Sequence, residues 1–484
     1  MNFPSSVDSF ENPSPTDKLN SPSHSGLHTQ INVAVVALEN FVLGRKIITV
    51  GKTAGCDYLC DGVSDDVQIQ EALNAVNSAG GGTVLVKAGT YDLQNVLVVG
   101  DNTTFTGEGI GATILRVGNH VWENLTTNPN LPAGANAYLN AFILSRSDAS
   151  GNGIGATVYG KRITIKDFTL NVNGQNQTIN TGGVGGSYVC GGIKLYPVYL
   201  CTIDHVEVQN ASWNGIALYG ANSPFFALPA SPNRITNCHV EAAGQGQTIL
   251  DVTAGILSDG AGQMGTIVSH NTVFNCSNFL AGIMVEDGSV GKVSNNFIYN
   301  CYRGISLAAA PLTQVNDNVI YLTIEDAFNF SIDGRATIEG NCVYYPGRYG
   351  IKITGQTIFK NNTIFYAGAS GIYIGGTSAN VQGNTIVDPG QIVASTHRAG
   401  IIIDLDLGVN NGLIMNNHIT DDNNISVNPA GVVTMQYGIR AIGTPTTVNN
   451  VNISNNLAKN AAITNIDLAA ITAGANYFAV SNIN

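Results

Sequence analysis

A loose repeat runs through the chain from Gly192 to about Asn456, and it limits what this chain can fold into. Each unit opens with a small residue followed by a large apolar one. Several successive openings lie 21 to 23 residues apart, and the longer intervals read as the same unit with an inserted loop. A repeat of this length is typical of a solenoid. The openings are Gly192-Ile193, Gly215-Ile216, Gly255-Ile256, Gly282-Ile283, Gly304-Ile305, Ala327-Phe328, Gly350-Ile351, Gly371-Ile372, Gly400-Ile401 and Gly438-Ile439.

The second half of each later unit carries an asparagine in the pattern apolar-x-x-Asn-x-apolar, and in two earlier units Val206 and Cys238 take its place. Asparagine tolerates left-handed backbone angles, and in stacked coils its amide can bond to the asparagine above and below. We therefore expect these residues at a tight bend between two strands, stacked at one corner. They are Asn271, Asn296, Asn318, Asn341, Asn362, Asn384, Asn417 and Asn456.

Apolar residues recur two apart within the units, as in Ile283-Met284-Val285, which indicates strands. The predicted fold is therefore all-β, a parallel β-helix in which each unit is one coil, from about residue 83 to the C-terminus. Charged residues make up only 11% of the chain, which suits such a surface. The alternative, an Asn- and Gly-rich sandwich, does not explain ten units with matching halves.

A second signal precedes the repeat. The segment Asp61-Gly62-Val63-Ser64-Asp65-Asp66 leads into a predicted helix with apolar face Ile69, Leu73 and Val76, capped by Asp65 or Ser64 and stopped at Ala79-Gly80-Gly81-Gly82. With the following Thr83-Val84 strand and Gly89-Thr90-Tyr91 turn, this block resembles the N-terminal segment of the pectate-lyase-like superfamily, which includes pectate lyases, polygalacturonases, alginate epimerases and many phage tailspikes. The resemblance implies a right-handed β-helix whose open N-terminal end is covered by the helix. Asp61, Asp65 and Asp66 then have a structural role.

We expect two parts, residues 1–46 and residues 47–484. The first is a flexible arm followed by a short helix with an apolar seam from Leu27 to Phe41. Its residues 21–28 and this seam resemble the start of many phage tail-fibre and tailspike proteins. The resemblance implies attachment to a phage tail or another assembly, and a homotrimer. The alternative is a helix packed on the body of the same chain.

Charge and composition exclude several classes of protein. A net charge of −12 argues against a nucleic-acid partner, which needs a basic stripe. We expect no membrane span and no signal peptide. The tailspike resemblance implies a place on a virion surface or otherwise outside the cell. No cofactor or metal is expected. Most of the eight cysteines are expected to be buried thiols, with a Cys56–Cys60 bond left open.

The candidate site lies on the Gly-Ile strand, whose third and fifth residues are expected to point outward and to form rows along the coils. The third-place row begins with Lys194, and the fifth-place row runs Tyr196, Tyr219, Asp259, Glu286. Paired carboxylates can hydrolyse a glycosidic bond, and tyrosines offer flat faces to sugar rings. The candidate catalytic residues are Asp259, Glu286 and, from a flanking insert, Asp251. The candidate substrate-binding residues are Tyr196, Tyr219, Lys194, Trp213 and Arg303.

These residues favour a phage-tailspike-like protein that binds and hydrolyses a cell-surface polysaccharide. Two alternatives stay open: a fibre or adhesin that binds glycan without cleaving it, and a polysaccharide lyase or epimerase with Lys194 or Arg303 as the basic partner. The ordered motifs of polygalacturonases are not found. A rival cluster on the second strand comprises Asp204, His205, Glu207, His239, Glu241 and His270.

Overall fold

A computed structural model describes residues 47–121, 141–146, 160–177, 191–219, 233–241, 254–259, 264–276, 281–286, 290–310, 312–330, 335–376, 378–391, 397–407, 409, 411–421, 435–444, 446–448, 451–461, 464–469, 471–473 and 478–480. The predicted arm of residues 1–46, with its Leu27–Phe41 seam, lies outside the described residues.

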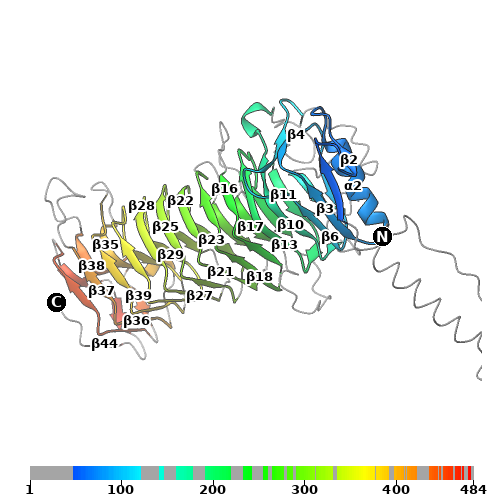
Figure 1. Cartoon of the computed structure of the whole chain (residues 1–484). Helices are drawn as coiled ribbons and strands as arrows, with labels where there is room; N and C mark the ends of the chain where they lie inside the picture. Colours follow the sequence, from blue (N-terminus) through cyan, green and yellow to red (C-terminus); the bar gives the residue numbers. More distant parts are fainter. Residues whose placement is uncertain are drawn as a thin grey trace, which may run out of the picture.

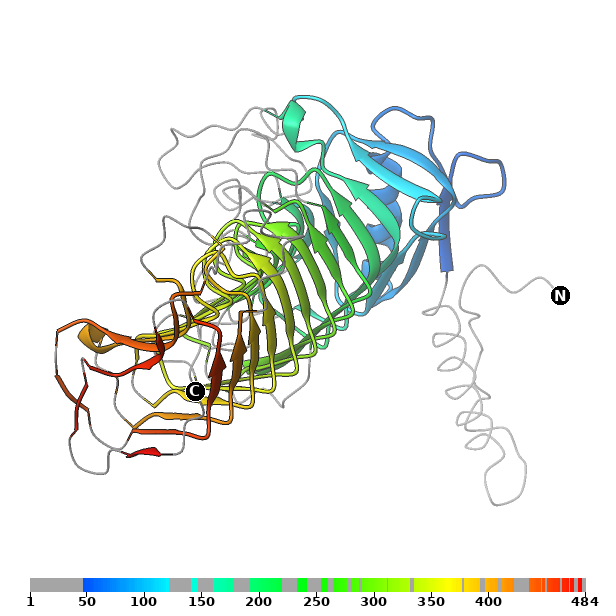
Figure 2. The ribbon, with the colours of Figure 1, turned by 90° about the vertical axis from the view of Figure 1, so that its left-hand side faces the viewer.

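The described residues form an elongated stack of coils, with the N-terminal helix at one end and the C-terminal strands at the other (Figure 1). Most coils contribute two strands to a large sheet, sheet A, and one strand to a second sheet, sheet B. Every strand pair runs parallel, and each strand pairs with its equivalent in the next coil, for example Ile283 with Ile305. Figure 2 shows the strands of successive coils one behind another. The predicted parallel β-helix is confirmed.

Sheet B contains 13 strands among the described residues. They are β5 Leu97–Val99, β8 Ala141–Ser145, β11 Gly191–Leu195, β14 Ile216–Tyr219, β17 Ala254–Asp259, β20 Ala281–Glu286, β23 Ile305–Ala308, β26 Phe328–Phe330, β29 Ile351–Ile353, β32 Ile372–Ile374, β35 Ala399–Asp404, β38 Tyr437–Ile442 and β42 Thr464–Asp467.

Sheet A folds into two faces along a bend. The strands before the bend are β1 Ile47–Gly51, β3 Gly82–Val86, β6 Thr103–Thr106, β15 Arg234–Thr236, β18 Met264–Ser269, β21 Val290–Ser294, β24 Gln314–Asn316, β27 Ala336–Glu339, β30 Thr357–Lys360, β33 Asn380–Gln382, β36 Leu413–Met415, β40 Asn452–Ser454 and β44 Phe478–Val480. The strands after it are β4 Gly89–Leu93, β7 Thr113–Val117, β16 His239–Glu241, β19 Thr272–Phe274, β22 Phe297–Cys301, β25 Val319–Thr323, β28 Cys342–Pro346, β31 Thr363–Phe365, β34 Thr385–Val387, β37 His418–Thr420 and β41 Leu457–Lys459.

The remaining elements are few. Strands β10 Thr164–Asn171 and β13 Thr202–Gln209 run through the bend, and β2 Tyr58–Leu59 pairs with β1. Two small sheets join β9 Gly160–Lys161 to β12 Val198–Tyr199, and β39 Thr446–Val448 to β43 Ile471–Ala473. The helices in the described part of the chain are α2 Asp66–Ser78 and the single turns η3 Gly174–Asn176 and η4 Leu405–Leu407.

An asparagine ladder marks the bend, as predicted. Each side-chain amide from Asn271 to Asn417 donates to the Oδ1 of the next asparagine, at 2.8–3.1 Å, and the ladder ends at Asn456. The left-handed backbone belongs to the residue before each ladder asparagine, such as Asn295 at φ 58° or Asp317 at φ 56°. The expectation that the ladder residue itself takes this conformation was wrong. The residue before each ladder asparagine turns the chain, and the asparagine itself forms the hydrogen bonds between the coils.

Helix α2 covers the N-terminal end of the stack. Its apolar side chains Ile69, Leu73 and Val76 are buried in the core. The Gln70 side-chain amide accepts a hydrogen bond from Val98 N and donates one to Val98 O. These bonds satisfy the backbone groups of Val98 on the open edge of β5. The carboxylate of Asp65 accepts backbone N–H groups of Gly62 and Asp92 and does not cap the helix. Asp66 likewise accepts from Gln94 N. These contacts give both carboxylates the structural role that was expected.

Close packing explains the small residue that opens each unit. A Cβ on Gly304 would lie 2.5 Å from Ala327 O of the next coil and 2.7 Å from Ile320 Cγ2 in the core. Equivalent contacts face the other opening glycines. The following isoleucine, such as Ile305, points inward and is fully buried.

The seven described cysteines are free thiols, so Cys56 and Cys60 are not bonded to each other. Cys276 and Cys301 are fully buried in adjacent coils. Burial raises the pKa of Cys60, Cys201 and Cys238 to about 12, so these thiols stay protonated. In the part of the chain that the structure describes, no helix is long and apolar enough to span a membrane.

Candidate functional site

The outer face of sheet B carries the predicted rows in the predicted register. Lys194 pairs with Ala217, and Ala217 with Leu257, so the third-place row is continuous. In the fifth place Tyr219 pairs with Asp259, and Asp259 with Glu286. The two carboxylate residues therefore occupy equivalent positions on adjacent strands, next to a tyrosine.

A lysine and two tyrosines form a compact group at one end of this face. The rings of Tyr196 and Tyr219 meet edge to face, with centroids 5.7 Å apart and planes at 78°. The Lys194 Nζ lies 5.5 Å and 5.3 Å from the two ring centroids. This is the geometry of a cation–π contact. The three predicted binding residues are thus in mutual contact.

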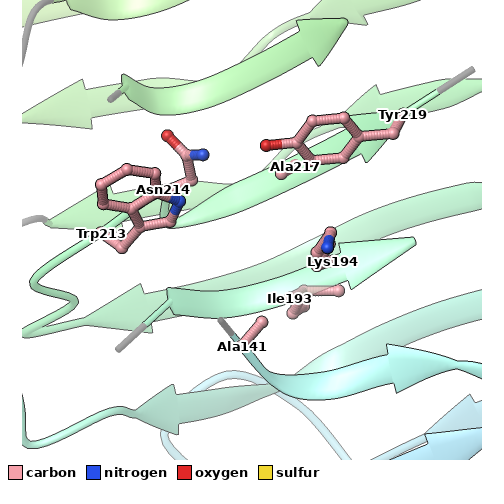
Figure 3. Close-up of a pocket in the computed structure, with 7 residues that line it drawn as sticks. All are labelled: Ala141, Ile193, Lys194, Trp213, Asn214, Ala217 and Tyr219. Atoms are coloured by element: carbon pink, nitrogen blue, oxygen red, sulfur yellow. The ribbon is translucent and has the colours of Figure 1, made fainter. Parts of the chain in front are cut away.

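Trp213 joins this group through a small pocket, which Ala141, Ile193, Lys194, Trp213, Asn214, Ala217 and Tyr219 line (Figure 3). Trp213 and Asn214 precede the strand that carries Ala217 and Tyr219, while Lys194 comes from the neighbouring strand. The Nε1 of Trp213 and the Nδ2 of the buried Asn214 are hydrogen-bond donors without an acceptor among the described residues. Both nitrogens are themselves buried, so the pocket encloses two unpaired donors and does not present them at the surface.

Burial of the third-place row differs from the expectation. Leu257 is 0% exposed and Met284 3%, and together with Ala217, Ala254 and Ala281 they form an apolar cluster on the outer side of sheet B. Strand alternation gives the direction in which a side chain points, but not what covers it. The third-place row in this region is therefore not an open surface.

The carboxylates differ in exposure. Asp259 is partly exposed, whereas Glu286 is only 8% exposed. The third candidate acid, Asp251, and most of the two inserts that flank the row lie outside the described residues.

Arg303 lies away from the two acids. It precedes Gly304 at the start of a sheet B strand, whereas Glu286 pairs with Ala308 at the far end of that strand. Its Nε and Nη2 donate to Glu325 Oε2 at 3.2 and 2.9 Å. The Arg303 guanidinium is therefore held in an ion pair with Glu325, at the other end of the sheet B strands from Glu286.

The rival cluster on sheet A is divided among separate contacts. His205 Nδ1 lies 2.8 Å from Asp167 Oδ1, and Asp204 accepts from Thr236 and Asn237. Glu207 accepts from Thr169, and Glu241 from Asn275. His239 and His270 are exposed. Among the described residues, no group of three or more His, Cys, Asp or Glu side chains has the arrangement of a metal site.

Sequence reasoning missed a second polar cluster on sheet B, near its C-terminal end. The hydroxyl of Tyr349 bonds to His397 Nδ1 at 2.9 Å, and the hydroxyl of Tyr373 donates to Asp404. The two tyrosine rings stack with centroids 4.9 Å apart, and Arg348 lies over the Tyr349 ring. Burial raises the pKa of Tyr349 and of Tyr373 and lowers the pKa of His397.

This second cluster is closed to solvent at its tyrosines, because Tyr349 is 2% and Tyr373 8% exposed. Its hydroxyls are engaged by the cluster itself, which favours a structural role. A signal for it was present in the sequence. Asp404 occupies the fifth place of the unit that opens at Gly400, and Arg440 the third place of the unit that opens at Gly438, so following both rows to the last units finds them. His397 comes from the segment before β35, where no such row predicts it.

Comparison with known proteins supports the fold. A family model described as the right-handed β-helix region matches residues 191–357 and 233–407, in two overlapping matches. The fold is that of a right-handed parallel β-helix. A curated relative, the pre-neck appendage protein of Bacillus phage B103, is 24% identical over 294 residues, which cover 57% of this chain and 28% of that protein. This β-helix spans less than a third of the length of each curated relative that it matches.

Two solved structures share the fold. The A-module of the mannuronan C-5 epimerase AlgE6 from Azotobacter vinelandii has a TM-score of 0.53 at 17% identity, covering 88% of this chain and 97% of the module. The tailspike protein of E. coli bacteriophage HK620, solved in complex with a pentasaccharide, has a TM-score of 0.53 at 13% identity, covering 90% of this chain and 81% of the tailspike chain. At such identities the likeness concerns the fold of the β-helix alone.

Proposed function

We propose that this β-helix binds a polysaccharide along the outer face of sheet B and hydrolyses it with Asp259 and Glu286. The observation that carries the proposal is the register of the fifth-place row, which sets two carboxylate residues on adjacent strands beside two tyrosines. The names of the compared proteins support a glycan ligand, since one is a tailspike with a bound pentasaccharide and another an epimerase of a polysaccharide. The phage appendage and tailspike names support display on a virion or another extracellular surface.

The chemistry follows from the spacing of the coils. Neighbouring parallel strands lie ~4.8 Å apart, close to the ~5 Å between the carboxyl groups of retaining glycosidases. In such a pair one carboxyl group protonates the leaving oxygen while the other attacks the anomeric carbon. Tyr196 and Tyr219 are partly exposed aromatic side chains that can contact a sugar, and Lys194 lies over both rings.

The test is release of reducing ends from candidate cell-surface polysaccharides. Asp259→Asn and Glu286→Gln should each lower the rate by a factor of about 100 or more, the size of an acid–base contribution. Glu339→Gln on sheet A is the matched control, because the carboxylate of this partly exposed glutamate contacts Lys360 and Asn361, away from sheet B. Asp251→Asn is assayed beside them. If wild type cleaves and both row variants keep full activity, the proposed pair is wrong and the rival residues Asp204 to Glu241 are tested next.

A second candidate function is a lyase or epimerase, which abstracts a proton beside a uronate carboxylate. The position of Lys194 beside Tyr196 and Tyr219 favours it, since an ammonium group can neutralise that carboxylate. Unsaturated products, or a change in sugar configuration without chain cleavage, would identify this reaction. Tight glycan binding with no product at all would identify an adhesin, and loss of binding in Tyr196→Ala and Tyr219→Ala would then locate its site.

A further inference from the structure

Two arginines on the outer face of sheet B, near its C-terminal end, lie over tyrosine rings. The Cζ of Arg348 is 4.7 Å from the centroid of the Tyr349 ring, and the Cζ of Arg440 is 4.2 Å from that of Tyr437. The two arginine side chains are 45% and 30% exposed. Stacking on a ring orients a guanidinium group and leaves its N–H edge open to an acceptor. Both arginines are therefore held in place and remain accessible to a ligand.

Neither arginine has a carboxylate within hydrogen-bond distance among the described residues. Arg348 Nη1 is 4.0 Å from Glu325 Oε1, and Arg440 Nε is 3.9 Å from Asp467 Oδ2, both too long for a hydrogen bond. Glu325 is held instead by Arg303, at 2.9 Å. The Nε of Arg440 is buried and has no hydrogen-bond partner among these residues. The two guanidinium groups therefore have donors to spare for an anion.

Both arginines act on the same histidine, although they come from different coils. Strand β29, which follows Arg348, and strand β38, which holds Arg440, are three coil spacings of ~4.8 Å apart, roughly 14 Å. Burial lowers the pKa of His397, Asp404 opposes this shift, and the charges of Arg348 and Arg440 add to it. The two positive charges therefore converge on one small region of the face, around His397.

The charges around this region favour an anion with a single charge. Lys352 adds a third positive side chain, which is partly exposed and stands opposite Tyr373 in the third-place row. The carboxylate of Asp404, which accepts from the Tyr373 hydroxyl, would repel a doubly charged anion more than a singly charged one. A planar guanidinium group binds a singly charged oxyanion through two parallel N–H bonds. On a sugar, such a group is a carboxylate or a sulfate ester.

This region lies on the same outer face of sheet B as the proposed catalytic pair. Glu286 is in the fifth-place row on β20, and Arg440 is in the third-place row on β38. Strands β20 and β29 are three coil spacings of ~4.8 Å apart, roughly 14 Å. A polysaccharide that lies along the axis of the stack would therefore pass both places.

We propose that Arg348 and Arg440 bind the negatively charged group of an acidic sugar, a carboxylate or a sulfate ester, and so select acidic polysaccharides over neutral ones. The proposal rests on the glycan binding proposed above, but not on catalysis by Asp259 and Glu286. It agrees with a structural role for the buried tyrosines, because the ring of Tyr349 supports a guanidinium group that contacts the ligand.

The test is the affinity of the full chain for glucuronate, glucose 6-sulfate and glucose, measured by titration calorimetry at low ionic strength. Wild type should bind at least one acidic sugar about 10-fold or more tightly than glucose, the size of one hydrogen bond to a charged group. The double variant Arg348→Gln/Arg440→Gln should lose this preference. Arg116→Gln/Arg335→Gln is the matched control, because it removes the same charge from two exposed arginines of the sheet A side, which contact Asp92 and Gln356. The control should bind as wild type does.

Arg348→Lys/Arg440→Lys serves if the glutamine variant fails to fold, because it keeps the charge, loses the planar fork and should also bind the acidic sugar more weakly. Equal affinity of wild type for the acidic sugars and glucose would overturn the proposal, as would no binding of either acidic sugar, or unchanged affinity in the arginine variants.

The outcome can be separated from that of the proposed hydrolysis. Acidic-sugar binding that persists in Asp259→Asn and Glu286→Gln, together with no cleavage of any polysaccharide by wild type, would leave this site in place and reject the hydrolysis. Cleavage of a neutral polysaccharide by wild type, at a rate that Arg348→Gln/Arg440→Gln leaves unchanged, would reject this site and leave the hydrolysis in place.

Discussion

At the scale of single residues, the repeat depends on small residues at positions with no room for a side chain. Gly304→Ala should lower the stability by about 1–3 kcal/mol, because its Cβ would clash with Ala327 O and Ile320 in the close-packed interior. Gly412→Ala is the control, since its nearest neighbour to a built Cβ is 3.6 Å away and its φ is not left-handed. Thermal unfolding of the two variants measures the difference. Equal melting temperatures would show that the opening glycine is not a packing requirement.

Residue patterns could be predicted where they repeat, and only there. The ladder residues and the inward isoleucines were found because they recur with the coil. The left-handed position was assigned one residue late, since pairs such as Asn295-Asn296 and Asn361-Asn362 place the same residue type at both positions. The register of Asp259 with Glu286 followed from spacing. The burial of Glu286 and the contact between Tyr349 and His397 did not, because the spacing gives the register of the strands and not what packs against each side chain.

At the scale of elements, the asparagine ladder acts as a continuous chain of hydrogen bonds. Asn341→Ala should lower the stability by about 1–3 kcal/mol for each buried donor that loses its acceptor. One donor does so, the backbone N of Asn318, whereas the Nδ2 of Asn318 loses its bond to Asn341 but keeps Val293 O and Asn316 O as acceptors. Asn316→Ala is the matched control, because its Oδ1 has no partner among the described residues. The loss of stability is measured by denaturant unfolding, with proteolytic cleavage at the bend as the readout. Similar losses in both variants would contradict a special role for the ladder.

For helix α2, the apolar pattern of the sequence predicted that the helix covers the end of the stack, but it did not predict which hydrogen bonds the helix makes there. The apolar spacing of Ile69, Leu73 and Val76 predicted the buried face. Asp65 stands at the N-cap position, yet its carboxylate bonds to Asp92 N of the β-helix. Tertiary contacts with the open strand edge therefore took precedence over local capping. Gln70, whose amide mimics a strand edge, carries no sequence signal for that role.

At the scale of the whole molecule, we expect unfolding to depend on pH through His397. Burial lowers the pKa of this histidine in the folded chain, so the unfolded chain takes up the proton first as the pH falls through about 6.5. Stability should then fall with pH. Asp404, Arg348 and Arg440 act on the same group, with Asp404 opposing the shift.

The measurement is the melting temperature of wild type and His397→Gln at several pH values from about 7.5 down to about 5, spanning the range in which histidine titrates. As the pH falls, the melting temperature of His397→Gln should decrease less than that of wild type, because the variant has no imidazole at this position to protonate. His418→Gln, on the exposed side of β37, is the control. A constant difference between wild type and the His397 variant across this range would rule out the histidine as the cause.

The direction of the asparagine ladder has a consequence for how chains like this change in length. Every rung donates toward the C-terminal side and accepts from the N-terminal side, so any rung can follow any other. Removing residues 319–341 would leave Asn318 to donate to Asn362, and the strands of both sheets would still pair with their equivalents in the next coil. The spacing between successive ladder asparagines varies from 21 to 39 residues, so the loops of a coil can change in length as long as an asparagine stands at the bend. Deletions and duplications are therefore tolerated in whole coils, and the reach of the molecule along its axis varies in steps of one coil.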